Sequence, residues 1–212
     1  MIAGNPDPLD IVRQGYDDVS YRYRGDDDSP ADYVAWLAEL NERMPPPGTV
    51  LDLGCGCGVP LARDLSLAGY DVTGVDISEV QIERARQLVP AAQFLRDDFT
   101  RLQFPAASFE AIVCLYAIIH VPRELQPALI TKIAAWLRPG GWLLITAGQE
   151  AWTGSQERWL GGAKTMWWSQ LDAESYRTLM VTAGLEVAEQ RFVPEGSSGH
   201  SLFWARRPAP NV

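Results

Sequence analysis

Glycines and carboxylates in the middle of the chain are spaced as they would be to hold a nucleotide-like ligand. The run from Val50 to Gly58 reads VLDLGCGCG and joins an apolar stretch to a helical pattern. Glycines at such a junction let the backbone approach a ligand closely. Asp76 ends the next apolar stretch, about twenty residues on, where a carboxylate can accept hydrogen bonds from both hydroxyls of a ribose.

A third apolar stretch ends in Arg96-Asp97-Asp98-Phe99, which places another carboxylate near the same edge. Such a carboxylate can accept a hydrogen bond from the amino group of adenine. Each feature also has a simpler interpretation. The glycine loop can be only a tight turn, and Asp76 can be an ordinary surface acid beside a helix.

Two other nucleotide-binding loops match the glycines less well. A dinucleotide fingerprint needs Gly-x-Gly-x-x-Gly, and its third glycine would fall at Val59. A triphosphate loop needs Gly-Lys-Ser/Thr, which does not follow. The sequence therefore weakens the hypothesis of a nicotinamide oxidoreductase.

The elements that would position these residues alternate between strand and helix patterns. This alternation predicts an α/β fold whose sheet is mostly parallel, with seven strands, an antiparallel C-terminal hairpin and a helical cap at the N-terminus. Ser29 is expected to cap a helix that starts at Pro30, and Ser78-Glu79-Val80-Gln81 is expected to form a capping box. The expected strands are 49–53, 71–75, 93–95, 112–116, 142–147, 185–192 and 201–206, and the expected helices open at 9–16 and at 30 and span 60–68, 78–88, 127–137 and 173–183.

The length of 212 residues and the hydrophobic fraction of 47% predict a single domain with appendages. We divide it into an N-terminal helical arm (1–47), a core that holds the glycine loop (48–147), a tryptophan-rich insertion (148–168) and a C-terminal helix with a strand hairpin (169–212). The insertion is expected to be loop-like.

Charge and composition limit the partners. The net charge of −9 opposes binding to DNA, RNA and anionic membranes. The longest apolar run, from Ala111 to Ile119, is about half of the ~18 to 20 residues that a membrane span needs. The N-terminus, MIAGNPDPLD, does not resemble a secretory signal, and three cysteines without zinc-site spacing favour free thiols and no metal site. We expect a cytoplasmic monomer or homodimer.

Taken together, these motifs resemble the class I S-adenosylmethionine-dependent methyltransferases. The resemblance runs from Thr49 to about Ala147 and includes the DLGCGCG loop, Asp76, Asp98-Phe99, the stretch SFEAIVCLYAIIHV and the turn LRPGGWLLI, in family order and spacing. It implies a three-layer Rossmann-like fold, S-adenosyl-L-methionine as cofactor and S-adenosyl-L-homocysteine as product. The implied reaction is in-line methyl transfer to a small-molecule acceptor.

The resemblance also implies roles for individual residues. Asp52, Gly54, Cys55 and Gly56 would surround the methionine portion, and Asp76 and Ile77 would hold the ribose and adenine. Asp98 would accept from the adenine amine beside Phe99, and Leu115 or Tyr116 would line the sulfonium end. Tyr16 and Tyr23 match a YDxxAxxY pattern in which the second tyrosine closes over the cofactor, although Ser20 replaces the usual alanine. Helix packing is an equal interpretation of both tyrosines.

The chain has two histidines, and His120 follows the fourth predicted strand, near the expected methyl group. If the acceptor is a hydroxyl, His120 is the candidate general base and substrate contact. Where many relatives have His-His-Val, this sequence has Ile119-His120-Val121. His200 is interpreted as structural.

Four of the eight tryptophans lie between Gly148 and Trp168. Such a cluster predicts a pocket for an apolar or aromatic acceptor, or else a hydrophobic plug over the sheet edge. The predicted substrate contacts are Tyr16, His120, Trp152, Trp159, Trp167 and Trp168. Cations in the variable segments that could bind an acidic acceptor are Arg22, Arg24, Arg158 and Lys164.

A different class of function also fits the sequence. The chain can be a catalytically silent module that binds S-adenosylmethionine and acts through partners. The sequence identifies neither the acceptor nor the atom that is methylated, which can be oxygen, nitrogen, sulfur or carbon.

Overall fold

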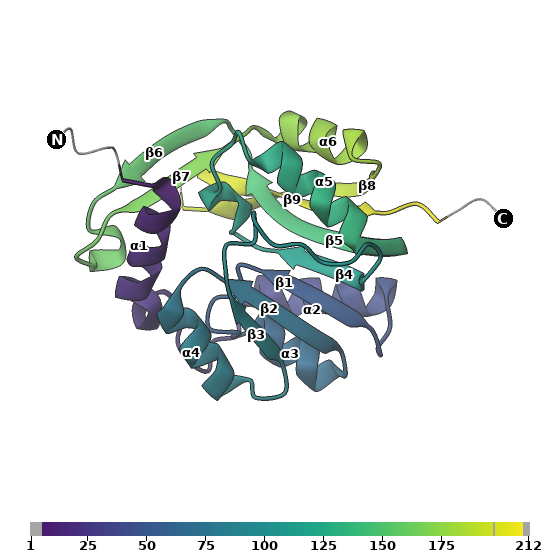
Figure 1. Ribbon diagram of the computed structural model, residues 1–212, viewed down its shortest axis with the longest axis horizontal. Coiled ribbons are helices and arrows are strands. Elements are labelled where there is room, and N and C mark those ends of the chain that lie inside the picture. The colour runs from purple at the N-terminus through teal and green to yellow at the C-terminus, as the bar shows by residue number, and fades with distance from the viewer. Residues whose placement is uncertain (1–5, 197, 210–212) are drawn as a thin grey trace.

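Seven strands form one sheet in the order β3-β2-β1-β4-β5-β9-β8 (Figure 1). The computed structural model describes residues 6–196 and 198–209, so the outermost residues of the N-terminal arm and of the C-terminal segment lie outside the described residues. The strands are β1 Thr49–Leu53, β2 Asp71–Asp76, β3 Gln93–Arg96, β4 Phe109–Cys114, β5 Leu137–Gly148, β8 Glu186–Glu195 and β9 Ser198–Arg206.

The strands from β3 to β5 are parallel, whereas β9 pairs antiparallel with both β5 and β8. The central strands are buried on both faces, as their continuous apolar sequences predict. This confirms the predicted mixed sheet. Because parallel strands run in one direction, the segments that follow β1, β2, β3 and β4 meet at one edge.

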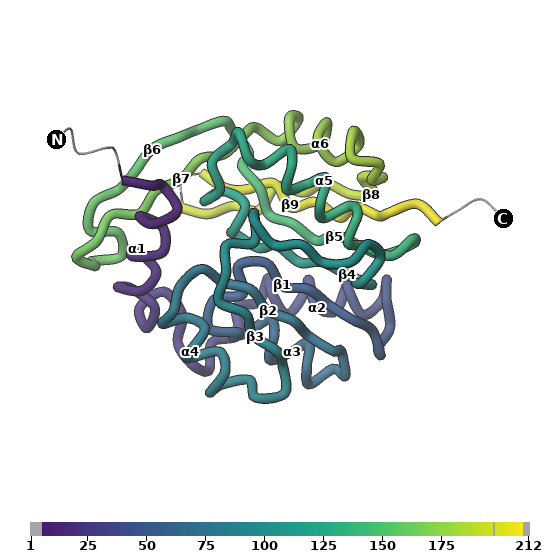
Figure 2. Tube along the Cα trace, in the orientation of Figure 1, coloured from purple at the N-terminus to yellow at the C-terminus, as the bar shows by residue number. Residues whose placement is uncertain are grey.

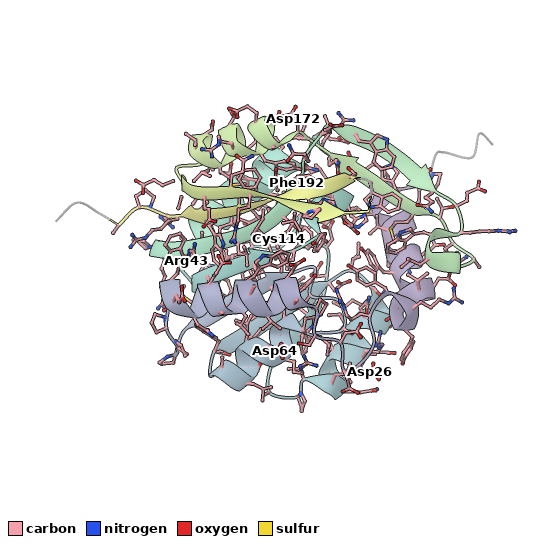
Figure 3. The ribbon with its side chains drawn as sticks, turned by 180° about the vertical axis from the view of Figure 1, so that it is seen from behind. Asp26, Arg43, Asp64, Cys114, Asp172 and Phe192 are labelled. Carbon is pink, nitrogen blue, oxygen red and sulfur yellow. The ribbon has the colours of Figure 1, made fainter. Side chains whose placement is uncertain are left out.

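Helices cover both faces of the sheet and make three layers. Alternate side chains of the central strands enter two separate apolar clusters, one with α2, α3 and α4 and the other with α5 and α6. Seen from behind in Figure 3, α2 lies below the β8–β9 hairpin, and Arg43 at its end pairs with Glu189 at 2.9 Å. The helices are α1 Pro8–Tyr23, α2 Ala31–Arg43, α3 Leu61–Ala68, α4 Glu79–Leu88, α5 Gln126–Trp136 and α6 Ala173–Thr182.

The first helix, α1, runs along the end of the sheet beside α4 and the strand β7 Met166–Gln170 (Figure 2). Its Asp17 Oδ1 accepts from the Ser78 hydroxyl at the start of α4 at 2.6 Å. Its Asp18 Oδ2 accepts from the backbone N–H of Ala163 at 2.6 Å. Side-chain contacts therefore fix α1 on two sides.

The helix starts differ in part from the prediction. The Ser78 hydroxyl accepts from the Gln81 N–H at 3.1 Å and so caps α4 as expected. The reciprocal half of the capping box does not form, because the Gln81 side chain instead accepts from the Ser20 hydroxyl at 2.8 Å. The predicted cap at Ser29 is wrong, because α2 starts after Pro30 without a side-chain cap.

Two C-terminal segments contain more strand than predicted. The insertion is not loop-like, because β6 Trp152–Gln156 pairs antiparallel with β7 Met166–Gln170. The C-terminal hairpin also extends beyond its predicted ends, since Val193 pairs with His200 and Glu195 with Ser198. Ladder pairing thus overrides the weak strand propensity of glycine and serine there.

No helix in the described part of the chain combines the length and apolar character that crossing a membrane requires. Nor do three or more histidine, cysteine or acidic side chains gather as possible metal ligands within residues 6–196 and 198–209.

Candidate cofactor and acceptor site

The glycine loop follows β1 and folds back onto β2. The N–H groups of Gly54 and Cys55 donate to the Val75 carbonyl at 2.8 and 3.0 Å. Gly54 and Gly56 have φ angles of +78° and +55°, which side chains other than glycine rarely adopt. A Cβ at Gly54 would lie 2.3 Å from the Cβ of Ala117, whereas one at Gly56 would have no neighbour nearer than 3.9 Å. Gly54 is therefore required for packing, and Gly56 faces open space.

That space is a cavity at the carboxyl edge of the sheet, and its empty volume of about 610 Å³ includes space open to solvent. It brings together eleven of the predicted site residues from α1, the glycine loop and the segments after β2, β3 and β4. They are Tyr16, Tyr23, Gly54, Gly56, Asp76, Ile77, Asp98, Phe99, Leu115, Tyr116 and His120. Among the described residues, no lysine or arginine lines this cavity.

A second cavity, whose empty volume of about 420 Å³ also includes space open to solvent, shares the glycine loop with the first. Its lining includes the two remaining predicted cofactor residues, Asp52 and Cys55, together with Arg24 and Tyr33. The two cavities also share Tyr23, Gln81 and Leu115. The predicted cofactor residues therefore all line one or both of these two cavities.

Asp52 is a buried carboxyl group without a counter-charge bonded to it. It is 2% exposed, and its Oδ2 atom has no hydrogen-bond partner among the described residues. Burial, and then the nearby Asp76 charge, raise the pKa of Asp52 to about 8. An unpartnered buried acceptor of this kind fits a cationic ligand group.

Asp76 organises the loop as well as facing the cavity. Its Oδ2 accepts from the Gly56 N–H at 2.9 Å, and its Oδ1 accepts from the Ser78 N–H at 2.8 Å. Each oxygen retains a lone pair for a ligand hydroxyl. Burial raises the pKa of Asp76 to about 6, although these backbone bonds act in the opposite direction.

Asp98 is held by its own turn after β3. Its Oδ1 accepts from the Thr100 N–H at 2.8 Å and from the Thr100 hydroxyl at 2.7 Å. Its Oδ2 lies 3.3 Å from Arg101 Nε. The side chain is therefore fixed at the rim of the cavity before any ligand arrives.

His120 does not present a free ring nitrogen to the cavity. Its Nδ1 lies 2.7 Å from the Trp167 carbonyl oxygen, and its Nε2 lies 2.9 Å from the Tyr16 hydroxyl. Because a carbonyl only accepts, Nδ1 carries the hydrogen, and Nε2 accepts from Tyr16. Burial lowers the pKa of His120 to about 4, so the ring is neutral. His120 thus lines the cavity with both ring nitrogens already hydrogen-bonded, and its contact with an acceptor stays a prediction.

The four tryptophans of the insertion lie behind the cavity wall, and none of them lines either cavity. The β6–β7 pairing holds them there. Trp159 packs edge-on against Tyr16 with centroids 5.5 Å apart, and Trp168 packs on His120 at 5.7 Å. Trp152 packs on Trp168 and is 48% exposed, and Trp167 contributes its carbonyl oxygen. The predicted direct substrate contacts by these rings are not what the geometry favours, because Tyr16 and His120 stand in front of them.

Two lining residues have roles that the sequence pattern does not predict. The sequence favours Arg24 only as a contact for an acidic acceptor, but Arg24 lines the same cavity as Asp52, over the rings of Tyr23 and Tyr33 at 5.5 and 5.1 Å. Gln81 is predicted only as part of a helix cap, although it lines both cavities. The one signal in the sequence for Arg24 is its position directly after Tyr23.

Comparison with known proteins agrees with this geometry. Residues 50–141 match the profile of a protein family described as "Methyltransferase domain". The matched segment holds the glycine loop, Asp76, Asp98 and His120. This segment, residues 50–141, is therefore similar to a methyltransferase domain.

Individual methyltransferases resemble parts of the chain. A 2-methyl-6-phytyl-1,4-hydroquinone methyltransferase of Synechocystis is 36% identical over 125 residues, which cover 55% of this chain and 38% of the relative. A sterol 24-C-methyltransferase of Gibberella zeae is 36% identical over 98 residues, which cover 43% of this chain and 25% of the relative. The similarity thus spans well under half of these relatives.

A solved methyltransferase structure matches almost the whole fold. The magnesium protoporphyrin IX methyltransferase of Synechocystis PCC 6803, crystallised with S-adenosylhomocysteine, superposes with a TM-score of 0.72. The match covers 95% of this chain and 100% of that chain at 21% identity. At this identity the likeness establishes the three-layer methyltransferase fold alone.

Proposed function

We propose that the protein transfers the methyl group of S-adenosyl-L-methionine to a neutral small-molecule acceptor and releases S-adenosyl-L-homocysteine. The observation that carries this proposal is the convergence of the glycine loop, Asp76 and Asp98 on one cavity, with the unpartnered carboxyl of Asp52 beside it. The family match supports the same reaction.

The second cavity fits the amino-acid end of the cofactor. A free amino acid end carries an ammonium and a carboxylate, and this cavity holds the carboxyl of Asp52 and the guanidinium of Arg24. Asp52 would attract the ammonium, while Arg24 would pair with the carboxylate. Gly54, Cys55 and Gly56 would approach this end with their backbone.

The first cavity fits the nucleoside end. The remaining lone pairs of Asp76 can accept from both ribose hydroxyls, and Ile77 and Phe99 can pack against the adenine. Asp98 stands at the rim, where it can accept from the adenine amine. Leu115, Tyr116 and Tyr23 would then surround the sulfonium end.

The bound cofactor supplies an activated methyl group, so the protein mainly has to hold an acceptor in line. Helix α1 contributes Leu9, Val12 and Tyr16 to the cavity wall and excludes water from that side. The absence of lysine and arginine from the described lining favours a neutral acceptor over an acidic one. The relatives named for a hydroquinone and a sterol support an apolar or aromatic skeleton.

Partners and location follow as expectations. The net charge of −9 supports a function without nucleic acid or anionic membranes. We also propose that the protein is a monomer or homodimer. Three buried cysteines with free thiols support a reducing, cytoplasmic compartment. We treat residues 1–47 and 148–168 as the parts of one methyltransferase domain that set acceptor specificity.

Binding is tested by thermal denaturation with S-adenosylmethionine, S-adenosylhomocysteine and NAD. A ligand at a hundred times its Kd stabilises a protein by about 2.7 kcal/mol, so the two adenosyl compounds should raise Tm and NAD should not. Stabilisation by NAD alone would contradict the proposal. Binding without transfer to any compound in a metabolite extract, followed by mass spectrometry, would instead support a silent binding module.

Asp76→Asn should weaken S-adenosylmethionine binding about tenfold, and Asp76→Ala by about 100-fold, since hydrogen bonds to a charged group contribute about 1.5–3 kcal/mol. The asparagine retains one oxygen acceptor, whereas alanine leaves the Gly56 and Ser78 N–H groups without their partner. Calorimetry measures both affinities. Asp71→Asn, which changes an exposed carboxylate at the other end of β2, is the control and should bind normally. Equal affinities in all variants would remove Asp76 from the site.

A further inference from the structure

Among the described residues that line the cavity, only Tyr16 has a side chain that donates a hydrogen bond to a histidine. It lines the cavity, while its hydroxyl donates to His120 Nε2 at 2.9 Å. The opposite nitrogen of the ring donates to the Trp167 carbonyl at 2.7 Å. Three groups from α1, the segment after β4 and β7 thus form one chain of hydrogen bonds.

The direction of this chain is set by its far end. The Trp167 carbonyl can only accept, so the neutral His120 ring must carry its hydrogen on Nδ1 and accept at Nε2. The Tyr16 hydroxyl then gives its hydrogen to His120. Its oxygen keeps lone pairs that can accept a hydrogen bond from the cavity side.

The surroundings hold the chain in place. Trp159 packs edge-on against the Tyr16 ring at 5.5 Å, and Trp168 packs on His120 at 5.7 Å. Asp17 and Asp18, which follow Tyr16 on α1, fasten the helix to α4 and to the insertion. Other titratable groups that face the pair are Tyr23 on α1, Tyr33 on α2, Asp76 after β2 and His200 on β9.

The geometry points to Tyr16 as the catalytic residue that receives a proton from a hydroxyl acceptor and passes its own proton to His120. This inference rests on the proposed methyl transfer and deepens it, because it specifies the acceptor as a hydroxyl on an apolar skeleton. His120 acts through Tyr16 and does not touch the acceptor. The tryptophans of the insertion support this pair instead of lining the pocket.

The step balances in atoms and charge. The acceptor oxygen forms a bond to the methyl carbon as the carbon–sulfur bond breaks, and that electron pair stays on sulfur. The hydroxyl proton moves to the Tyr16 oxygen while the Tyr16 proton moves to His120 Nε2. The resulting imidazolium keeps its Nδ1–H on the Trp167 carbonyl and loses its extra proton to water after the product leaves.

The burial of Tyr16 and His120 supports a proton relay through a neutral tyrosine and not a tyrosinate that acts as the base. It raises the pKa of Tyr16 well above its usual range, so the hydroxyl keeps its proton until His120 takes it. Burial also lowers the pKa of His120 to about 4, which keeps Nε2 free to accept at neutral pH. The weakly basic ring suffices because an oxygen that is gaining a methyl group becomes strongly acidic.

Nitrogen NMR of the histidine rings tests the chain without any acceptor. The protein has only two histidines, so spectra of His120→Gln and His200→Gln assign both rings. With S-adenosylhomocysteine bound, His120 should show a hydrogen on Nδ1, a bare Nε2 and no titration between pH 5 and pH 8. Tyr16→Phe should shift the Nε2 signal. A hydrogen on Nε2, or a ring that is charged at pH 7, would overturn the inference.

Kinetics with 2-naphthol, 2-naphthylamine and 2-naphthalenethiol test the acceptor class on one skeleton. We expect methylation of the naphthol, with kcat lowered by about 10²- to 10⁴-fold in Tyr16→Phe and in His120→Gln and the KM for S-adenosylmethionine unchanged. The double variant should lose no more than either single variant, because the residues act as a unit. Tyr70→Phe removes a hydroxyl that bonds Asn41 outside the site and serves as control.

The outcomes separate this inference from the proposed function. No binding of S-adenosylmethionine would refute methyl transfer itself. Binding with transfer to the amine or thiol alone, or with a Tyr16→Phe variant as active as Tyr70→Phe on the naphthol, would refute the relay and leave methyl transfer intact. If none of the three compounds is methylated, the NMR result decides.

Discussion

We expect Gly56→Val to abolish measurable binding of S-adenosylmethionine, a loss of at least about 100-fold, in a protein that still folds. Gly56 has a φ of +55°, and a Cβ there would point into the cavity with its nearest neighbour, Gln81, 3.9 Å away. A valine side chain would therefore occupy space that the proposed ligand needs. If the loop instead moved to a negative φ, the bond from the Gly56 N–H to Asp76 would break.

The strain of a left-handed valine needs its own control, because it costs about 1–2 kcal/mol wherever it occurs. Gly184→Val provides it: Gly184 has a φ of +86°, follows α6 and would have nothing within 4 Å of an added Cβ. Both variants should lower Tm by similar amounts, and only Gly56→Val should lose binding in calorimetry. Unimpaired binding by a folded Gly56→Val protein would show that the loop is only a turn.

The central part of the fold could be predicted from local patterns. The strand at residues 49–53 has its predicted bounds, because a buried parallel strand has a continuous apolar sequence that a glycine ends. The same logic places Asp76 and Asp98 at one edge. Sheet direction fixes where strands end, so local patterns are enough to predict that these carboxylates converge.

Contacts between distant segments could not be predicted in this way. The bond between Tyr16 and His120 joins residues 104 positions apart, and the position of α1 over the cavity depends on Asp17, Asp18 and a hairpin that has no strong strand signal. The tryptophans likewise indicate an aromatic region, but they do not predict which rings line the cavity and which pack behind them. Which ring faces a ligand depends on the β6–β7 register, which composition does not encode.

We also expect the affinity for S-adenosylmethionine to rise steeply with pH between about 6 and 7.5. Burial raises the pKa of Asp52 to about 8, so without ligand this carboxyl holds a proton at neutral pH. A cationic ligand group beside Asp52 favours the charged form, so binding releases that proton. By linkage, affinity increases by roughly tenfold per pH unit below the free pKa and levels off above it.

The raised pKa of Asp52 also makes the stability of the ligand-free protein depend on pH. The folded pKa of Asp52, about 8, lies far above the ordinary aspartate value of 3.8 that applies to the unfolded chain. The stability contribution of the protonated group is therefore complete below about pH 4 and is lost as the pH rises through 8. Thermal denaturation of the free protein should give a falling Tm over this interval, and Asp52→Asn should flatten the fall.

Calorimetry at pH 7 in two buffers with different ionisation enthalpies measures the proton released on binding. The natural protein should release close to one proton, and Asp52→Asn should release much less and bind more weakly at every pH. Below pH 7.5 the amino group of the ligand stays largely protonated. Asp76 has a pKa of about 6, so it contributes to the proton release only at the acidic end of this pH range. If Asp52→Asn and the natural protein released the same number of protons, the cation would lie elsewhere, and Asp52 would be a buried structural acid instead of a ligand contact.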